Sequence, residues 1–436
     1  MKKAYLSTLG CKVNQFETAA FKSQLEQQGV VVTSDLEEAD YIIVNTCTVT
    51  AKAGGESRRE VRKALRRNDR AKVLVTGCHA QLEHDELIRL PDIDSSRLVI
   101  AGNDAKERII TNLLAGHSET DSRPRVEIRQ VQEIASLQVD RFAGRTRAYL
   151  RVQDGCESFC SYCIVPYARG RSRSLPLAEV MRQAFIYEQA GHHEIVVTGI
   201  HVGRYGHDLS EKCNIVGLLD RLCQEFSSIR FRLSSIEPLE IGPELLNLMI
   251  QAENLMPHLH IPLQSGDNEV LKRMNRRYTR EQFREVIDKC RAAVPDAAIG
   301  FDVMVGFPGE TDSMFEQSRE LIESSECTYL HVFPFSKRPG TRAAEFEDQV
   351  TTDAKQKRVE ILRTLGREKS SAFYRRYINS RRDALLETEK LSGSALKGYT
   401  DNYIPVVTAL PRELPTEPVV VELIELSGEA VKARIV

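Results

Sequence analysis

Short apolar runs alternate with longer segments of helical periodicity over the first quarter of the chain. The apolar runs are Ala4–Thr8, Tyr41–Thr46, Val73–Gly77 and Leu98–Ala101. This alternation is typical of β–α units, in which buried parallel strands are covered by helices. The pattern predicts an N-terminal Rossmann-like α/β domain with a parallel sheet, spanning residues 1–116.

The same alternation returns, more regularly, in the middle of the chain. A polar stretch, GHSETDSRPRVEIRQ, first predicts a linker over residues 117–140. Six apolar runs follow it, at Tyr149–Val152, Glu194–Gly199, Arg230–Ser235, His258–Pro262, Ile299–Val305 and Tyr329–Pro334. Six β–α units in series predict an open sheet or a partial (βα)6 barrel over residues 141–370. In both architectures the chemistry lies at the C-terminal ends of the strands.

The last part of the chain changes character. A basic amphipathic segment, Asp353–Arg376, predicts a helix that closes the middle region. Beyond it come β-type runs separated by Gly, Pro and Asn, at Ala384–Thr388, Tyr403–Ala409, Val419–Leu426 and Val431–Val436. Short strands with such breaks predict a small all-β barrel over residues 371–436.

Composition narrows the class of protein. A chain of 436 residues with 42% hydrophobic and 28% charged residues is globular, and two to three domains are expected. No apolar run is long enough for a membrane span or a secretion signal, so we expect a cytoplasmic protein with no membrane partner. Ten cysteines in such a protein indicate metal binding or redox chemistry rather than structural disulfides. The net charge of −2 means that any RNA site must be a local patch.

Three of the cysteines lie within eight residues, in the segment DGCESFCSYCIVPYARG directly after the first strand of the middle region. Cys156, Cys160 and Cys163 have the C-x3-C-x2-C spacing. Three thiolates suit the soft irons of a cubane cluster and leave a fourth iron open for another ligand. Structural zinc is the alternative, but zinc usually takes four ligands in two pairs. The segment resembles the radical S-adenosylmethionine (SAM) superfamily, which implies a [4Fe-4S] cluster that cleaves SAM to a 5′-deoxyadenosyl radical.

A second set of thiols is spread over the N-terminal region. Cys11, Cys47 and Cys78 each come just after a predicted parallel strand. The carboxyl ends of such strands share one edge of the sheet, so these thiols could converge on a second [4Fe-4S] cluster. The alternative is three buried structural thiols. Four further cysteines fall in predicted helices or core positions and are interpreted as structural: Cys213, Cys223, Cys290 and Cys327.

The motifs GCKVNQFE, NTCTVT and TGCHAQ, followed by DGCESFCSYCIVPYARGRSRS, resemble the methylthiotransferase family along almost the entire chain. GCKVN with NTCTVT is most similar to the tRNA enzymes that act on N6-threonylcarbamoyladenosine at position 37, beside the anticodon. Isopentenyladenosine enzymes are closer to GCQMN and ribosomal-protein enzymes to GCPKN. Both remain alternatives, as does a non-catalytic iron–sulfur protein that binds RNA or senses redox state.

The resemblance implies three parts: a methylthiotransferase domain, a radical SAM partial barrel and a C-terminal TRAM β-barrel that binds RNA. It also implies two [4Fe-4S] clusters and SAM as cofactors. The N-terminal cluster would carry or deliver sulfur, one SAM would methylate that sulfur, and a second would supply the radical that removes hydrogen from adenine C2. The expected partners are the tRNA anticodon stem-loop and an electron donor such as flavodoxin or ferredoxin, whereas the sulfur donor stays unknown.

Eight residues at or near strand ends of the middle region are candidate SAM contacts. TGIHVG resembles the turn that binds the methionyl group of SAM, polar side chains after the next strands could bond ribose or carboxylate, and two aromatic rings could contact adenine. Asp302 could instead bind the substrate or cap a helix, and each of the others could be structural. The candidates are Tyr162, Thr198, Gly199, Ser235, Glu237, Gln264, Asp302 and Phe333.

Arginines gather around the radical-cluster motif. From Arg141 to Arg182 there are eight arginines and three acidic residues. Because guanidinium groups bind phosphate and stack on bases, YARGRSRS is interpreted as a loop that faces RNA, with a solvated charged face as the alternative. LKRMNRRYTR is a second basic loop. The candidate RNA contacts are Arg169, Arg171, Arg173, Arg273 and Arg276.

Overall fold

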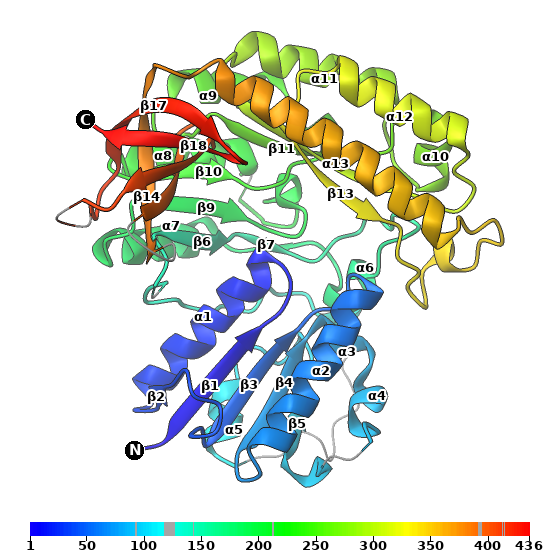
Figure 1. Cartoon of the computed structure of the whole chain (residues 1–436). Helices are drawn as coiled ribbons and strands as arrows, with labels where there is room; N and C mark the ends of the chain where they lie inside the picture. Colours follow the sequence, from blue (N-terminus) through cyan, green and yellow to red (C-terminus); the bar gives the residue numbers. More distant parts are fainter. Residues whose placement is uncertain are drawn as a thin grey trace.

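The structure is a computed structural model that describes residues 1–91, 94–116, 127–142, 144–211, 213–390, 395–411, 413 and 415–436. It has three parts (Figure 1). The N-terminal α/β domain lies below, the strands and helices of the middle region lie above it, and a small β-barrel packs against one side of the middle region. This arrangement confirms the predicted fold class.

The N-terminal domain is a five-stranded parallel sheet in the order β2-β1-β3-β4-β5. All four predicted strands are confirmed, and the two-residue β2 is the one described strand that was not expected. Successive strand residues such as Ile42 and Ile43 pack into separate apolar clusters on the two faces of the sheet. The elements are β1 (Lys3–Thr8), α1 (Lys12–Gln27), β2 (Val31–Val32), β3 (Tyr41–Thr46), α2 (Ala51–Arg67), β4 (Lys72–Gly77), α3 (Cys78–Leu82), α4 (His84–Ile88), β5 (Leu98–Ile100) and α5 (Ile109–Leu114).

The middle region contains two three-stranded parallel sheets, β10-β9-β6 and β11-β12-β13. Isolated bridges, Phe231 to Leu255 and Ser235 to His260, join them into the wall of the predicted partial barrel. Among the described strands, β6 and β13 pair on one side only and form its free edges. The strands are β6 (Arg147–Arg151), β9 (Glu194–Thr198), β10 (Arg230–Leu233), β11 (His258–Gln264), β12 (Ala298–Val305) and β13 (Tyr329–Pro334), with a short β7 (Gln153–Asp154) and β8 (Arg173–Ser174) hairpin.

Helices follow the strands of this barrel, as the periodicity predicted. The helices are α6 (Val165–Arg169), α7 (Leu177–Gln189), α8 (Ile215–Glu225), α9 (Pro243–Gln251), α10 (Asn268–Arg273), α11 (Arg280–Ala293), α12 (Asp312–Ser324) and α13 (Thr352–Arg375). Short 3-10 helical turns lie in several of the connections between strands and helices. Capping by Thr279 and Gln282 at the start of α11 shows how local sequence starts such a helix.

The segment that leads into the middle region packs against the barrel over the residues that the structure describes. Residues 117–126 of the predicted linker lie outside the described residues. After them Ile134, Leu137 and Val139 are buried and belong to the same apolar cluster as the barrel strands. The end of this segment therefore docks on the barrel through its own apolar side chains.

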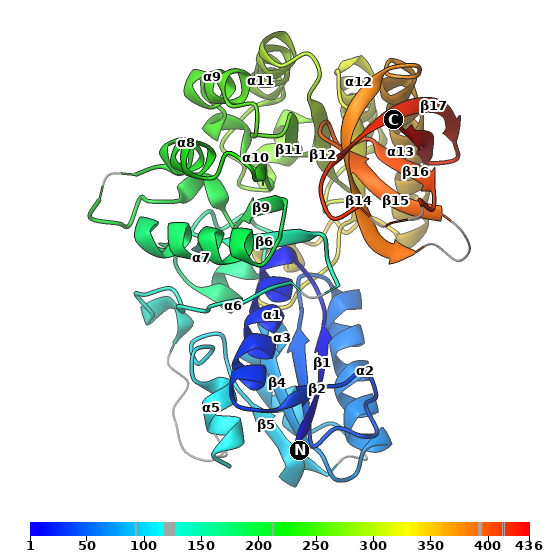
Figure 2. The same ribbon diagram turned by 90° about the vertical axis from the view of Figure 1, so that its left-hand side faces the viewer.

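The C-terminal part is a closed barrel with strand order β14-β15-β16-β18-β17. Figure 2 shows it beside α13, and Phe373 and Tyr374 of that helix share an apolar cluster with the barrel strands. The predicted runs are confirmed, except that β16 begins at Pro405 because Tyr403 has a positive φ of 65° in the preceding turn. The strands are β14 (Arg381–Lys390), β15 (Ala395–Thr400), β16 (Pro405–Ala409), β17 (Val419–Ser427) and β18 (Ala430–Ile435), of which β15 was not expected.

Candidate active site at the domain junction

The thiols of Cys156, Cys160 and Cys163 lie on one clamped loop after β7. Gly155 has a φ of +74°, and a Cβ there would lie 1.8 Å from the carbonyl oxygen of Arg171, so this position requires glycine. The backbone N–H of Cys156 donates to Gly170 O at 3.1 Å. All three thiols are half-buried, and all ten cysteines of the chain are free of disulfides. The loop thus presents three unpaired thiols from a rigid backbone.

Two basic side chains touch this loop. His201 Nδ1 lies 3.6 Å from Cys156 Sγ, and Arg276 Nη1 donates to Cys160 Sγ at 3.4 Å. Burial lowers the pKa of His201, but its hydrogen bonds with Cys156 and Glu240 raise it overall, to about 10. The pKa of Cys163 is raised by burial to about 12. Hydrogen bonds from His201 and Ser158 outweigh burial at Cys156 and lower its pKa, whereas burial raises the pKa of Cys160 in spite of the charge of Arg276.

Cys11, Cys47 and Cys78 lie at the upper edge of the N-terminal sheet, directly after β1, β3 and β4. A Cβ on Gly10 would lie 2.9 Å from Cys47 Sγ, so this glycine lets the first loop approach the second. Burial raises the pKa of Cys47 to about 11, and negative charge on Cys78 and on Cys11 adds to the shift. The charges of Cys78 and Cys11 thus act on Cys47, and the shared cluster at these three thiols stays a prediction.

A buried ion-pair network connects the two sets of cysteines. Arg169 at the end of α6 donates to Glu17 of α1 at 3.0 Å and to Asp154 at 2.9 Å. Its other nitrogen donates to Asn14 at 2.6 Å. Lys106 pairs with Glu17 from the other side. Arg169 and Glu17 are 1% and 0% exposed, so their charges are compensated by buried protein groups rather than by water.

This network lies between the loops that carry the two sets of cysteines. Asn14 follows Cys11 by three residues, and its amide nitrogen donates to Leu9 O and Thr46 O, beside Cys11 and Cys47. Asp154 precedes Cys156 by two residues. Figure 1 shows α6 next to α3 at the same junction. Arg169 thus fixes the two cysteine sets relative to each other. Sequence reasoning missed Glu17 and Lys106, because a single Glu or Lys in a helix or loop carries no signal of burial.

The predicted SAM contacts divide into two groups. In the radical-cluster loop, Tyr162 packs edge-on against Phe307, with ring centroids 6.5 Å apart. Thr198, which directly precedes Gly199, is buried. A Cβ on Gly199 would lie 2.9 Å from Gln153 Oε1, so glycine is needed there. His201, two residues later, was not predicted, although the TGIHVG turn pointed to its position.

The remaining candidates lie on the later strands. Glu237 is paired with Arg276, Gln264 has a φ of +59°, and Ser235 bridges to His260. Asp302 accepts a hydrogen bond from His260 and lies 3.4 Å from His331 Nδ1 rather than capping a helix, and Phe333 is 43% exposed on β13. The structure therefore connects Glu237 to the radical-cluster loop through Arg276, which also donates to Cys160, and places Asp302 among histidines.

The arginines expected at RNA do not share one environment. Arg169 and Arg173 are buried, and Arg173 donates to backbone carbonyls of residues 133, 169 and 171. Their donors are used inside the protein, which differs from the expectation that they contact phosphate. Arg276 is also buried against Glu237, and Arg273 pairs with Asp348. Arg171 is exposed and remains available to a polyanion.

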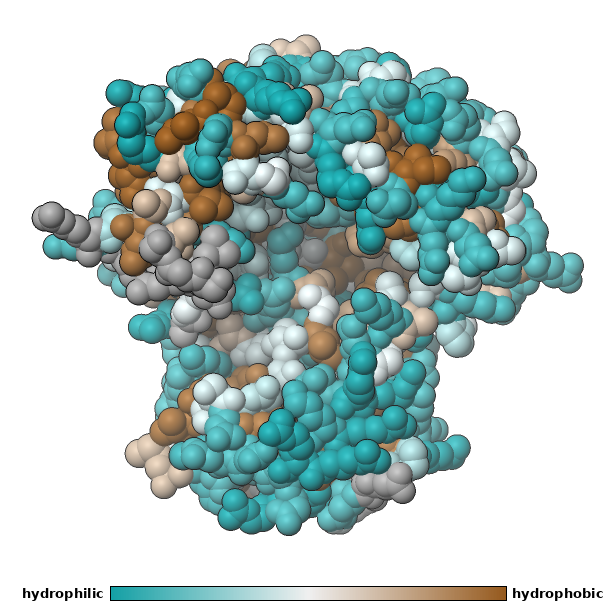
Figure 3. Space-filling view, viewed as in Figure 1, coloured by the Kyte–Doolittle hydropathy of each residue, from teal (hydrophilic) through white to brown (hydrophobic). Residues whose placement is uncertain are grey.

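A cavity of about 890 Å³ lies between β13, α13 and the C-terminal barrel. Figure 3 shows the surface deeply recessed between the N-terminal domain and the parts above it. The cavity lining combines aromatic and basic side chains, among them Tyr329, His331, Arg363, Tyr399 and Tyr403.

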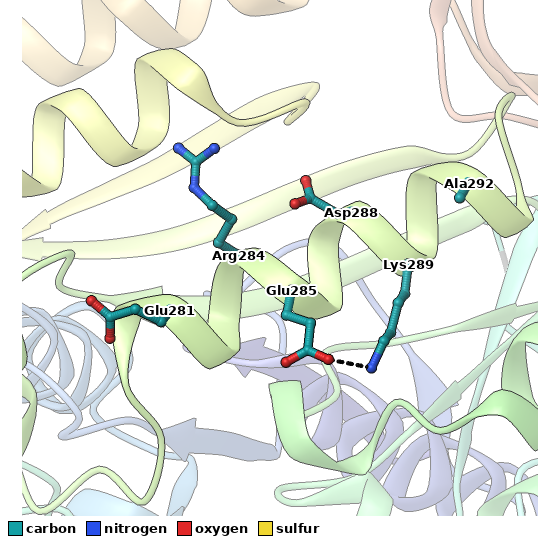
Figure 4. A pocket seen from close by; sticks show the side chains of 6 residues that line it. All are labelled: Glu281, Arg284, Glu285, Asp288, Lys289 and Ala292. Atoms are coloured by element: carbon teal, nitrogen blue, oxygen red, sulfur yellow. Dashed lines mark hydrogen bonds and ion pairs between the residues drawn. The ribbon is translucent and has the colours of Figure 1, made fainter.

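A second, shallower hollow lies on the outer face of α11 and has a different lining from this cavity. There Figure 4 shows charged side chains of one helix and Ala292, with Lys289 paired to Glu285 at 2.6 Å.

Known proteins share both the sequence pattern and the architecture. Residues 150–322 match the model of the radical SAM superfamily, and residues 3–97 match the uncharacterized protein family UPF0004. A threonylcarbamoyladenosine tRNA methylthiotransferase of Bacillus subtilis strain 168 is 39% identical over 92% of this chain and 89% of its own length. A tRNA-2-methylthio-N(6)-dimethylallyladenosine synthase of Agrobacterium fabrum is 34% identical over 88% and 87%. The chain belongs to the radical SAM methylthiotransferase family.

The family resemblance seen in the sequence is thus confirmed, and the chain is a transferase. A solved structure of the radical SAM methyltransferase TsrM from Kitasatospora setae superposes with a TM-score of 0.58 at 17% identity, over 79% of this chain and 77% of that one. This similarity concerns the fold alone. No helix in the described part of the chain is both long and apolar enough to cross a membrane.

SAM and [4Fe-4S] clusters are the cofactors of this transferase, and its residues fit such groups. Each cysteine set offers three soft, unpaired thiols, as a cluster with one open iron requires. Cationic side chains lie beside both sets: His201 and Arg276 at one, and Arg169, whose charge lowers the pKa of Cys78 against the effect of burial, at the other. Such charges offset the negative charge of a thiolate-bound cluster.

Proposed function

We propose that this enzyme methylthiolates C2 of N6-threonylcarbamoyladenosine at position 37 of tRNA. The N-terminal α/β domain (residues 1–116), the radical SAM barrel (141–370) and the TRAM barrel (371–436) act together on the anticodon stem-loop. Cys156, Cys160 and Cys163 hold the cluster that activates SAM, and Cys11, Cys47 and Cys78 hold the second cluster. The clusters and SAM supply the radical and sulfur chemistry when they are bound.

One observation carries this proposal: two separate sets of three free thiols face one junction and are linked by the Arg169 network. Cleavage of SAM needs only the first set. The second set, held by the approach of Gly10 to Cys47, is what a sulfur-delivering cluster requires. Because Arg169 joins the loops of both sets, the substrate carbon can meet both centres without a large domain movement.

The choice of substrate rests on similarity. The Bacillus subtilis relative is named for threonylcarbamoyladenosine, and the Agrobacterium fabrum relative for dimethylallyladenosine at lower identity. The GCKVN motif of this chain favours the first. We further propose that the reaction takes place in the cytoplasm and that a flavodoxin or ferredoxin is the electron donor.

Mass spectrometry of tRNA nucleosides tests the substrate directly. A strain that lacks this gene should lose 2-methylthio-N6-threonylcarbamoyladenosine and accumulate its precursor without the methylthio group. Loss of the isopentenyl nucleoside, or of a methylthiolated ribosomal aspartate, would assign one of the alternative substrates instead.

A second experiment separates the enzyme from a non-catalytic iron–sulfur protein. Anaerobically reconstituted protein, incubated with SAM and dithionite, should form 5′-deoxyadenosine. Substituting Cys156 by Ala should abolish this product, whereas wild-type protein that forms none would contradict the enzymatic function.

A further inference from the structure

Three polar side chains on adjacent strands meet on the inner face of the barrel, outside both cysteine sets. His260 Nε2 donates to Asp302 Oδ1 at 2.9 Å, and His331 Nδ1 lies 3.4 Å from the same oxygen. Asp302 and His331 are register partners on β12 and β13, and His260 on β11 pairs with Gly300, two residues before Asp302. The triad, as we name these three residues, belongs to the barrel wall rather than to a loop, so its geometry is rigid.

The triad is open toward the large cavity. His331 lines that cavity, and its side chain is 51% exposed on the free edge strand β13. Asp302 is mostly buried. Burial alone would raise its pKa, but hydrogen bonds from the two histidines hold that pKa below the ordinary range, so it is a carboxylate. Among the described residues nothing bonds Asp302 Oδ2 or His331 Nε2, which leaves one acceptor and one imidazole nitrogen for a ligand.

The charge of one lysine, Lys12, acts on a histidine of the same wall. Lys12, at the start of α1, makes no ion pair with any residue that the structure describes, although it is half-buried. Its ammonium is close enough to the buried His258, two residues before His260, to help lower the pKa of that imidazole, after the larger effects of burial, Arg232 and His260. Figure 1 shows this end of α1 directly beneath the barrel.

These groups match the substituent that distinguishes the proposed substrate. N6-threonylcarbamoyladenosine carries a ureido N–H, a hydroxyl and a carboxylate, whereas an isopentenyl group is a plain hydrocarbon. A hydrocarbon placed here would cover the carboxylate of Asp302 and the free nitrogen of His331 without replacing their bonds to water, which is unfavourable. A polar amino-acid substituent can replace those bonds.

We propose that the triad of His260, Asp302 and His331 binds the amino-acid substituent on N6 of the target adenine, and that Lys12 offsets the charge of its carboxylate. The site selects adenosines whose N6 group is polar and anionic. This inference rests on the proposed function, because it assumes that the threonylcarbamoyl nucleoside enters the barrel.

Equilibrium binding of anticodon stem-loops tests the site without turnover. The protein is the anaerobically reconstituted holoenzyme with SAM and no reductant, and affinity is read by fluorescence anisotropy. Four stem-loops differ only at position 37: unmodified adenine, the threonylcarbamoyl form, its methyl ester, and the isopentenyl form. Wild-type enzyme should bind the threonylcarbamoyl form at least about tenfold more tightly than the unmodified or isopentenyl form.

Three variants then locate the preference. His331→Ala and Asp302→Asn should reduce it to about twofold or less while leaving affinity for the unmodified stem-loop unchanged. Lys12→Gln should lose only that part of the preference which wild-type enzyme loses when the carboxylate is replaced by the methyl ester. The matched controls are His207→Ala, an exposed histidine, and Lys289→Gln on the outer face of α11, and both should keep the full preference.

The outcomes distinguish this inference from the proposed function. If wild-type enzyme prefers the isopentenyl form, the proposed substrate is wrong and the inference falls with it. If wild-type enzyme prefers the threonylcarbamoyl form but His331→Ala and Asp302→Asn retain that preference, only the inference is overturned. The same holds if purified enzyme carries a bound zinc ion that His331→Ala removes, since the metal would then occupy the triad. The comparison of the methyl ester with the threonylcarbamoyl form uses wild-type enzyme alone, so this test of the carboxylate holds even if a variant misfolds.

Discussion

The two sets of cysteines reach the same junction by opposite routes. Cys156, Cys160 and Cys163 lie within one loop, so a short stretch of backbone positions all three thiols. Cys11, Cys47 and Cys78 are far apart in the chain and meet only because β1, β3 and β4 are neighbours in a parallel sheet. The first set depends on local geometry, whereas the second depends on the whole N-terminal domain. Changes near one set should therefore affect the two clusters unequally.

Removal of each set should have the largest effect. Reconstituted wild-type enzyme should hold about eight irons, and replacing Cys11, Cys47 and Cys78 together by Ala should reduce this to about four. SAM cleavage should persist in that variant, because the loop set is intact. Replacing Cys156, Cys160 and Cys163 should abolish SAM cleavage and spare the other cluster. Iron analysis and 5′-deoxyadenosine formation measure both, and full iron content in the first variant would disprove a second cluster.

Arg169→Gln should come next, because it removes the cation shared by both sets. Glu17 and Asp154 would remain buried with less compensation, and breaking a buried pair in this way costs about 3–5 kcal/mol. Urea unfolding of the cluster-free protein should show this loss. Arg171→Gln, two residues away and exposed, is the matched control and should change stability by less than about 0.5 kcal/mol. Equal effects of the two substitutions would mean that Arg169 does not hold the junction.

Acid should weaken the same junction. Burial by itself raises the pKa of Glu17, but Arg169 and Lys106 lower it to about 2. A carboxyl with a depressed pKa in the folded protein stabilises it above the unfolded value of about 4.5, and this contribution is lost as the pH falls from there toward 2. The difference in unfolding free energy between wild type and Glu17→Gln should therefore shrink over this range. A difference that is constant with pH would show that Glu17 is not charged in the native state.

Charge reversal at Arg171 should have the smallest effect. Arg171→Glu should weaken tRNA binding and reduce the slope of log affinity against log salt by about one to two, because an exposed phosphate contact is lost. Arg59→Glu, on an exposed face of α2, is the control. Neither substitution should change iron content. An unchanged salt slope for Arg171→Glu would move the RNA contact to another surface.

The order of the elements and the radical-cluster loop follow from short stretches of the chain. The periodicity predicted the strands that precede Cys11, Cys47 and Cys78, and the C-x3-C-x2-C spacing predicted an iron–sulfur cluster at the loop set. These features are local, since strand and helix periodicity and metal-ligand spacing are properties of short stretches of chain. The strand β15 was missed because Lys397 and Gly398 interrupt its apolar pattern.

The burial and pairing of the charged side chains, in contrast, depend on how distant segments pack together. Arg169 and Arg171 look alike in YARGRSRS, but the docking of α6 on the N-terminal domain buries the first and leaves the second exposed. His260, Asp302 and His331 come from three strands, and their register brings them to one oxygen. Burial and charge pairing depend on contacts between distant segments, which is why the sequence pattern alone could not assign these roles.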